Sequence, residues 1–390
     1  MRIRARRPCY LQIDDKPFPD LSLLSEGTLN WTKAAQTFLL CPITGASLWV
    51  APAELALLSR LPGAEWTPAQ RWIDEGLATA EGLASLVQRQ LVVSDGPESQ
   101  NLRDGEARLE SAGWLSVAAL YHAQTRWSGV TAEPDMDQAS LLGRLKDHAQ
   151  IYGEPPGTFV RRDDAQAEVA LPSPEAGSLS SVLRSRFTAR AFLMDRDLPL
   201  AAFSDVLAEV FGVQGAETGP DGLTFLKKTS PSGGSLHPVE AYPLVVKVEG
   251  LRTGLYHYRA EDHTLELLEP MEVDQARNLI TEATAGQRYF GEAHAAIIHV
   301  ARFHRVFWKY RQHAKLYKAV LMDVAHLSQT LYLSATARGL GAWFTAAIND
   351  GDLGLRLGLD PLTEGVLALS GLGLADLSQT QRHFRPQGRN

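Results

Sequence analysis

Cysteine is scarce in this 390-residue chain, which contains only Cys9 and Cys41 and no C-x-x-C pair. This excludes a disulfide framework and a cysteine-based metal site, and it is typical of a cytoplasmic protein. Long apolar runs are missing too, and the basic start Met1–Arg7 lacks the apolar stretch of a secretory signal. An excess of positive charge is also absent, because the net charge is −7. We therefore expect a cytoplasmic protein that binds no metal, no membrane and no nucleic acid.

The composition is that of a globular protein, with 45% hydrophobic and 21% charged residues. At this length the chain can form two domains with a substantial core. Stretches rich in proline and glycine, together with shifts in pattern, divide it into three parts. We expect a small N-terminal domain at residues 1–100, a helical connector at 101–178 and a larger domain at 179–390.

The first part has the outline of a winged helix. The pattern predicts a strand at Ser47–Val50, helices at Pro52–Arg60, from Thr67-Pro68 onward and at Glu81–Gln90, and a strand at Leu91–Val93. A slightly acidic balance argues against a DNA reader. This part resembles the leader-peptide recognition modules of many peptide-modifying enzymes, which would bind a peptide by strand addition at the wing edge. A structural cap without a ligand is the alternative.

The connector is expected to hold two helices. Glu110–Trp127 and Gln138–Gln150 have helical spacing, and proline and glycine follow the second of them. His122 lies on the apolar side of the first. We interpret His122 as a packed, hydrogen-bonded helix residue, because an isolated histidine is usually structural.

The third part alternates strand and helix patterns. Tyr242–Val248, Gly254–Tyr258 and Thr264–Leu268 predict a meander of antiparallel strands. Ala295–Ala301 is apolar enough to be a central strand. Leu198–Phe211 has the spacing of an amphipathic helix. Together these patterns predict an α+β domain.

A turn with two adjacent glycines precedes the first of these strands. Paired glycine lets backbone N–H groups approach a ligand with no Cβ in the way, which suits a phosphate or a flat ring. A tight turn without a ligand is the alternative. The residues of the turn are Pro231, Ser232, Gly233, Gly234 and Ser235.

A second motif, Arg186-x-Thr188-x-Arg190, lies upstream of the turn. Two guanidinium groups can bind a phosphate bidentately, with a hydroxyl between them. In an extended segment, positions i, i+2 and i+4 lie on one side, so we expect the three side chains to point the same way. A solvated basic turn is the alternative.

These motifs resemble those of the SagB-type dehydrogenases, the flavin-dependent azoline oxidases of ribosomal-peptide maturation in the nitroreductase-like superfamily. The shared features are the Pro-Ser-Gly-Gly-x-x-His-Pro segment and the Arg-x-Ser-x-Arg motif, in which Thr188 replaces the serine. The resemblance covers about residues 183–385. It implies a domain that binds FMN with a mixed, largely antiparallel sheet flanked by helices, joined here to the winged-helix-like domain.

The resemblance also implies a catalytic pair. The family places a Lys-Tyr pair on the substrate side of the flavin, which corresponds to Lys309 as general base and Tyr310 as its partner. A lysine acts as a base near neutral pH only when desolvation or nearby cations favour its neutral form. We expect Phe307 and Trp308 to exclude water there. A cationic helix start at the surface is the alternative, and Ala325 departs from the glycine that is common in the family.

The remaining cofactor contacts follow from the same resemblance. The helical pattern Leu316–Arg338, apolar over much of its circumference, corresponds to the helix that the family buries between two subunits, so a homodimer is expected. A segment beside the N5 edge of the flavin and a last phosphate-binding arginine complete the site. The residues implied are Gln329, Thr345, Ala346, Ala347 and Arg385.

The implied reaction is the two-electron oxidation of an azoline ring to an azole in a precursor peptide, with a cyclodehydratase as a possible partner. One alternative is a flavin reductase that uses NAD(P)H on dehydroamino acids, nitro compounds or quinones. A second alternative is a peptide-binding scaffold without catalysis.

Overall fold

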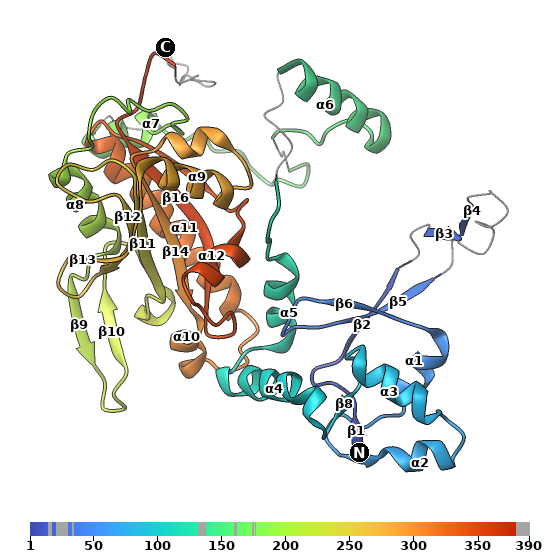
Figure 1. Cartoon of the computed structure of the whole chain (residues 1–390). Coiled ribbons are helices and arrows are strands. Elements are labelled where there is room, and N and C mark those ends of the chain that lie inside the picture. The colour runs from blue at the N-terminus through green and yellow to red at the C-terminus, as the bar shows by residue number, and fades with distance from the viewer. Residues whose placement is uncertain are drawn as a thin grey trace.

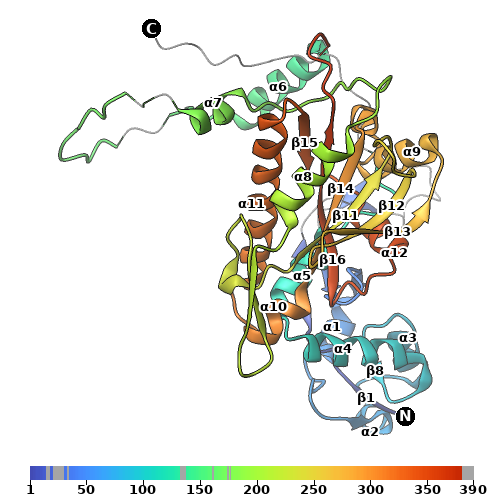
Figure 2. The same cartoon turned by 90° about the vertical axis from the view of Figure 1, so that its left-hand side faces the viewer.

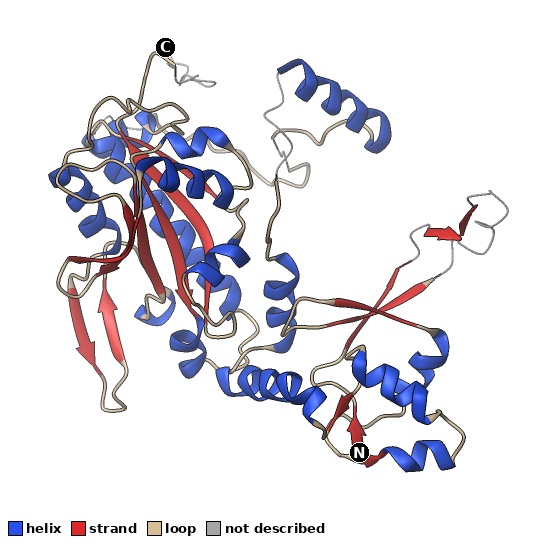
Figure 3. Ribbon diagram, viewed as in Figure 1, coloured by secondary structure: helices blue, strands red, loops and turns tan. Residues whose placement is uncertain are grey.

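The computed structural model describes residues 1–14, 18–20, 30–32, 35–131, 138–159, 162–173, 175 and 177–379. An N-terminal module of short strands and helices is joined by a helical connector to a larger domain built on one sheet (Figures 1 and 3). The connector begins with α4 (Gln100–Ala112), and α7 (Ser178–Ser185) leads into the larger domain.

The larger domain is organised around a six-stranded sheet in the order β13-β12-β11-β14-β16-β15. All five neighbouring pairs are antiparallel, and one isolated parallel bridge joins Thr188 to Ala342 at the β15 edge. The expected α+β domain with a largely antiparallel sheet is therefore confirmed. The strands are β11 (Val239–Val245), β12 (Gly254–Arg259), β13 (Thr264–Pro270), β14 (Ala295–Arg302), β15 (Gly341–Thr345) and β16 (Glu364–Gly373).

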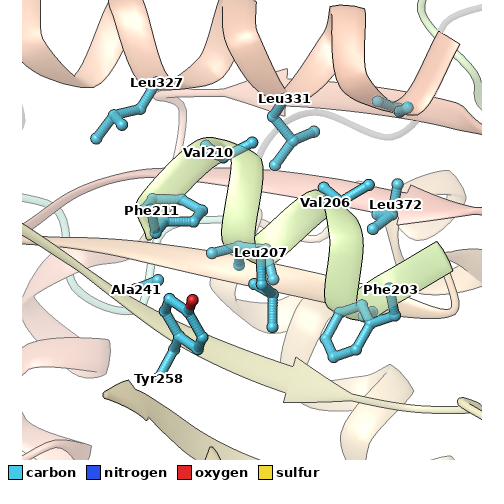
Figure 4. Close-up of a cluster of buried hydrophobic side chains, with 14 of the residues drawn as sticks. Phe203, Val206, Leu207, Val210, Phe211, Ala241, Tyr258, Leu327, Leu331 and Leu372 are labelled. Carbon is cyan, nitrogen blue, oxygen red and sulfur yellow. The ribbon is translucent and has the colours of Figure 1, made fainter. Parts of the chain in front are cut away.

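Helices cover both faces of this sheet, which gives the three layers seen in Figure 2. Helices α8 (Leu200–Phe211) and α11 (Leu316–Ala337) pack on one face, and α9 (Val273–Ala283) and α12 (Asp350–Arg356) pack on the other. The apolar side of α8 is buried as its spacing predicts, and Figure 4 shows Phe203 and its neighbours between α11 and the sheet. Each such fully buried side chain stabilises the fold by about 1.5–3 kcal/mol.

Two smaller elements, a helix and a hairpin, carry or adjoin the predicted site residues. Helix α10 (Phe303–Lys309) follows β14, and the hairpin β9 (Gly215–Thr218) and β10 (Thr224–Lys227) projects from the body of the domain in Figure 1. The hairpin leads directly into the glycine turn, which contains a short 3₁₀ helix at Gly233–Ser235.

Within its described residues, the N-terminal module has two three-stranded sheets, ordered β7-β1-β8 and β2-β5-β6, a two-stranded sheet of β3 and β4, and three helices. The strand predicted at Ser47–Val50 is confirmed. Thr67-Pro68 does not begin a helix: it is the short strand β7, because it pairs with β1 (Arg2–Arg4), and the helix begins one residue later. The remaining elements are β2 (Tyr10–Asp14), β3 (Phe18–Asp20), β4 (Asn30–Thr32), β5 (Gln36–Leu40), β6 (Ser47–Val50), α1 (Pro52–Leu58), α2 (Ala69–Asp74), α3 (Ala80–Gln88) and β8 (Val93–Ser94).

The connector forms more helices than predicted. The single helix expected at Glu110–Trp127 is broken at Gly113, whose φ of 78° ends α4 before α5 (Ser116–Thr125) begins. The helix expected at Gln138–Gln150 is present as α6 (Gln138–Tyr152).

Helix α4 joins the N-terminal module to the larger domain. Near its middle, the buried carboxylate of Glu106 forms an ion pair with the buried guanidinium of Arg4 in β1. At its end, the carbonyls of Glu110 and Ser111 accept hydrogen bonds of 2.9 Å from Arg311. The end of α4 is thereby fixed beside the last turn of α10.

Candidate active site

The glycine turn lies between the hairpin and β11, and its backbone needs unusual angles. Gly234 has φ of 68°, a conformation that glycine adopts without a steric penalty. Ser235 and His237 also have positive φ, at 57° and 44°. A turn with three such residues needs support from its surroundings.

Helix α11 supplies that support through three contacts with the turn and the residue before it. Asp323, His326 and Thr330 lie on one side of α11, at spacings of three and four residues. The contacts join Ser230 Oγ to Thr330 Oγ1 at 2.7 Å, the Pro231 carbonyl oxygen to His326 Nδ1 at 3.3 Å, and Ser232 Oγ to Asp323 Oδ2 at 2.7 Å.

The end of α10 brings the predicted catalytic pair to the same turn. A Cβ added at Gly234 would lie 2.7 Å from the hydroxyl oxygen of Tyr310, so the phenol covers this glycine. The ammonium of Lys309 lies 4.8 Å from the ring centroid of Phe225 in β10 and 5.0 Å from that of Tyr310. Lys309, Tyr310 and the glycine turn therefore form one cluster.

The expected exclusion of water by the neighbouring aromatic residues holds only in part. Phe307 is buried, but Trp308 is 55% exposed and Lys309 is exposed as well. In α10 the buried side is occupied by Phe303, Val306 and Phe307, and their spacing directs Trp308 outward.

The predicted phosphate-binding segment Arg186-x-Thr188-x-Arg190, here called the phosphate motif, contacts the edge of the sheet and α11. Thr188 bridges to β15, and its hydroxyl lies 3.1 Å from that of Tyr332. The guanidinium of Arg186 lies 5.2 Å from the Tyr332 ring, whereas that of Arg190 lies 5.8 Å from the Tyr289 ring.

The expected common direction of the three side chains is therefore not observed. Tyr332 belongs to the buried cluster on the α11 face and Tyr289 packs against the cluster on the opposite face, so the two guanidinium groups diverge toward different aromatic surfaces. In the part of the chain that the structure describes, neither Arg186 nor Arg190 forms an ion pair, so both can bind an anion.

The two predicted cofactor motifs contact opposite flanks of α11. Ser230, just before the glycine turn, contacts Thr330, and Thr188 of the phosphate motif contacts Tyr332. Residues 330 and 332 are about 200° apart around a helix. An exposed stripe that includes Met322, Ala325 and Gln329 lies between them.

The segment after β15 presents backbone groups to solvent. Ala346 and Ala347 are exposed, and the N–H of Ala347 donates to Thr345 Oγ1 at 3.1 Å. The N–H of Ala346 has no hydrogen-bond partner among the described residues, so it can donate to a ligand. Arg385 lies outside the described residues.

A buried polar group behind the turn was not predicted from the sequence. Lys228, His237 and Asp323 line a cavity of about 10 Å³, and each side chain is less than 10% exposed. Burial lowers the pKa of Lys228 and lowers that of His237 to about 4, so His237 is neutral. Burial also works against the carboxylate of neighbouring Glu240, but the nearby His257 imidazole and a hydrogen bond from Arg302 hold its pKa at about 2.

His122 is a packed helix residue, as its isolated position predicts. It is buried, and its Nδ1 lies 3.0 Å from the Tyr317 hydroxyl. The described residues include no group of three or more His, Cys, Asp or Glu arranged to bind a metal. No helix in the same part of the chain is both long and apolar enough to cross a bilayer.

Comparison with known proteins identifies the domain that carries this site. A sequence profile described as "Nitroreductase family" matches residues 183–374. Trifolitoxin-processing protein TfxB of Rhizobium leguminosarum bv. trifolii is 29% identical over 149 residues, which are 37% of this chain and 38% of that protein. This chain therefore spans well under half the length of that relative.

A solved structure and a second relative extend the comparison. The E. coli microcin synthetase McbBCD complex with truncated pro-MccB17 bound matches with a TM-score of 0.50 and 19% identity, over 69% of this chain and 97% of the matched chain, which shows a shared fold. Putative nitroreductase MJ1384 of Methanocaldococcus jannaschii is 31% identical over 186 residues, which are 48% of this chain and 87% of that protein. With that coverage and the profile match over the sheet domain, the chain belongs to the nitroreductase family of oxidoreductases.

Proposed function

We propose that this chain is an FMN-dependent oxidoreductase of ribosomal-peptide maturation that oxidises azoline rings to azoles in a precursor peptide. The observation that carries the proposal is the approach of Tyr310 to Gly234, which unites the predicted catalytic pair with the glycine turn. The similarity to a trifolitoxin-processing protein supports a peptide as the substrate.

The residues present fit FMN. Arg186 and Arg190 would hold the phosphate, with the Thr188 hydroxyl between them, because both guanidinium groups are exposed and have no carboxylate partner among the described residues. To meet at one phosphate, the two long side chains would turn from the Tyr332 and Tyr289 rings that they contact in this structure. The glycine turn and the free N–H of Ala346 would contact the ring system. FMN, when bound, supplies the two-electron acceptor that the oxidation requires.

The chain's own residues would bind the ring and take a proton from it. Azoline oxidation removes a proton from Cα and a hydride from Cβ of the ring, and Lys309 would accept the proton while the Tyr310 hydroxyl orients the substrate. Because Lys309 is exposed, a bound peptide or a second protein chain must cover it to favour the neutral amine.

The placement of the two cofactor motifs favours a homodimer. They contact opposite flanks of α11, and the exposed stripe between them includes the apolar Met322 and the predicted cofactor residue Gln329. A second copy packed on this stripe would bring the glycine turn of one chain toward the phosphate motif of the other.

The N-terminal module offers an edge at which a leader peptide could add as a strand. Strand β6 is at the edge of its sheet, and a hollow of about 360 Å³ lies beside it. Gln36 and the half-exposed Trp49 line this hollow, which would give a peptide both polar and aromatic contacts. A cyclodehydratase that forms the azoline would be the natural partner upstream.

The test combines cofactor uptake with turnover. Purified full-length protein is titrated with FMN and then incubated in air with an azoline-containing peptide, and mass spectrometry follows the loss of two hydrogens per ring. Uptake of FMN with ring oxidation supports the proposal. Protein that takes up no FMN would contradict it. Rapid anaerobic bleaching of the flavin by NADPH without ring oxidation would instead favour a flavin reductase.

A further inference from the structure

One buried carboxylate holds the glycine turn and has no assigned role. Asp323 is 7% exposed, its Oδ2 accepts a hydrogen bond of 2.7 Å from Ser232 Oγ, and the N–H of Gly233 also points to the carboxylate. Ser232 Oγ in turn accepts a hydrogen bond of 3.0 Å from the N–H of His237. The Ser232 hydroxyl thus connects the two ends of the turn to α11.

Burial of the Asp323 carboxylate destabilises the fold unless its hydrogen bonds to the turn compensate. Taking a carboxylate out of water costs free energy, and burial raises the pKa of Asp323 accordingly. Among the described residues, Asp323 forms no ion pair, since the nearby ammonium of Lys228 interacts with Glu240 instead. The contribution of Asp323 is therefore to accept hydrogen bonds from Ser232 and Gly233.

We propose that Asp323 is a positioning residue of the cofactor site, acting through Ser232. It fixes the positive-φ conformation of Gly234, which places the turn beneath the Tyr310 hydroxyl and presents its backbone to the ring system. Because the hydroxyl hydrogen of Ser232 is used for Asp323, Ser232 supports the turn and does not donate to the cofactor. This inference rests on the proposed FMN site.

The test measures FMN affinity in full-length protein by quenching of flavin fluorescence. Asp323→Ala and Ser232→Ala should each raise the Kd by about tenfold, as expected for the loss of a hydrogen bond to a charged group. The double variant should add little, because both changes break the same bond. The matched control is Asp205→Ala, which removes an exposed carboxylate of α8 and should leave the Kd unchanged.

The visible absorption spectrum of bound FMN separates positioning from general stability. It should change in both single variants and stay unchanged in the control, and Asp323→Asn, which keeps an acceptor oxygen, should lie closer to the wild type than Asp323→Ala does. A wild-type Kd and spectrum in Asp323→Ala would overturn the inference.

If Asp323→Ala fails to fold, Ser232→Ala decides by the same criteria, since it removes the other partner of the bond. A wild-type protein that takes up no FMN would overturn the proposed function, and this inference with it. FMN uptake by the wild type combined with unchanged variants would overturn the inference alone.

Discussion

The indole of Trp343 in β15 lies across the backbone of Gly371 in β16. The two residues are paired in register, and a methyl group added at Gly371 would overlap the indole ring. Trp343 is fully buried, so its ring has no space into which it can move.

Gly371→Ala is therefore expected to destabilise the domain by about 3 kcal/mol or more, at the upper end of the cost of overpacking. Gly354→Ala is the control, because its Cβ would meet nothing within 4 Å in α12, where alanine is the better helix former. Urea denaturation measures both. Equal midpoints for Gly371→Ala and the wild type would show that the indole does not occupy this position.

Two buried histidines predict a loss of stability in acid. Burial lowers the pKa of His122 and of His299 from 6.5 to about 3. Because the folded-state pKa is lowered, the unfolded chain binds protons below pH 6.5 that the folded chain does not. Their contribution is fully present above pH 6.5 and is lost as the pH falls toward 3.

Lowering the pH from 7 to 5 should reduce the free energy of unfolding by about 2 kcal/mol for each of these histidines. His299→Gln should reduce that loss by about the same amount, measured by urea denaturation at both pH values. His148→Gln, at an exposed position of α6, should change nothing. The same pH dependence in His299→Gln and the wild type would contradict the neutral, buried state of His299.

Strands β11 to β14 of the sheet could be predicted from the sequence because they are short runs of strand-forming residues separated by clear turns. Ala295–Ala301 was expected to be central and forms β14, which is buried along its length and flanked by β11 and β16. Strand β1 carries only Ile3 as a large apolar residue among arginines, so periodicity does not reveal it. It exists because it pairs with β7 and β8 and buries Arg4 against Glu106.

The site could be predicted in part. The resemblance to a family, and not local periodicity, identified the pair Lys309–Tyr310, and the structure places that pair beside the glycine turn. The role of Asp323 could not be predicted, because it depends on a contact with a residue 91 positions away. The direction of Trp308 depends on which side of α10 packs against α4 and the sheet, which the sequence of a seven-residue helix does not determine.

The contact between Tyr310 and Gly234 makes a prediction about the turn. Gly234→Ala would place a methyl group 2.7 Å from the Tyr310 hydroxyl and would strain a residue at φ of 68°. Azoline oxidation should fall by about tenfold or more, because the turn or the phenol must move by a fraction of an ångström to an ångström.

Gly250→Ala is the matched control for that change. Gly250 has φ of 71° but open space around its Cβ, so the variant carries the same backbone strain without the contact. Turnover by Gly250→Ala should stay near the wild-type rate. If both variants lose the same fraction of activity, backbone strain and not the Tyr310 contact explains the effect.

Replacing either arginine of the phosphate motif should weaken FMN binding. Arg186→Gln and Arg190→Gln should each weaken FMN binding by about 1.5–3 kcal/mol, or roughly 10- to 150-fold, because each removes a charged donor to the phosphate. Arg184→Gln is the control, since Arg184 is an exposed arginine of α7 outside the motif. Fluorescence titration gives the Kd values. Equal losses in all three variants would indicate a general effect of positive charge.

If Lys309 is the general base, its replacement should slow turnover without weakening FMN binding. Lys309 contacts the rings of Phe225 and Tyr310 and lies outside the phosphate motif, so Lys309→Ala should keep FMN bound. Its rate of azoline oxidation should fall by at least about 100-fold, the usual contribution of a general base. Lys315→Ala, at an exposed position just before α11, should oxidise the peptide at the wild-type rate. Because both variants lose one exposed positive charge, a difference between them assigns the effect to the position of Lys309. A wild-type rate in Lys309→Ala would exclude it as the base.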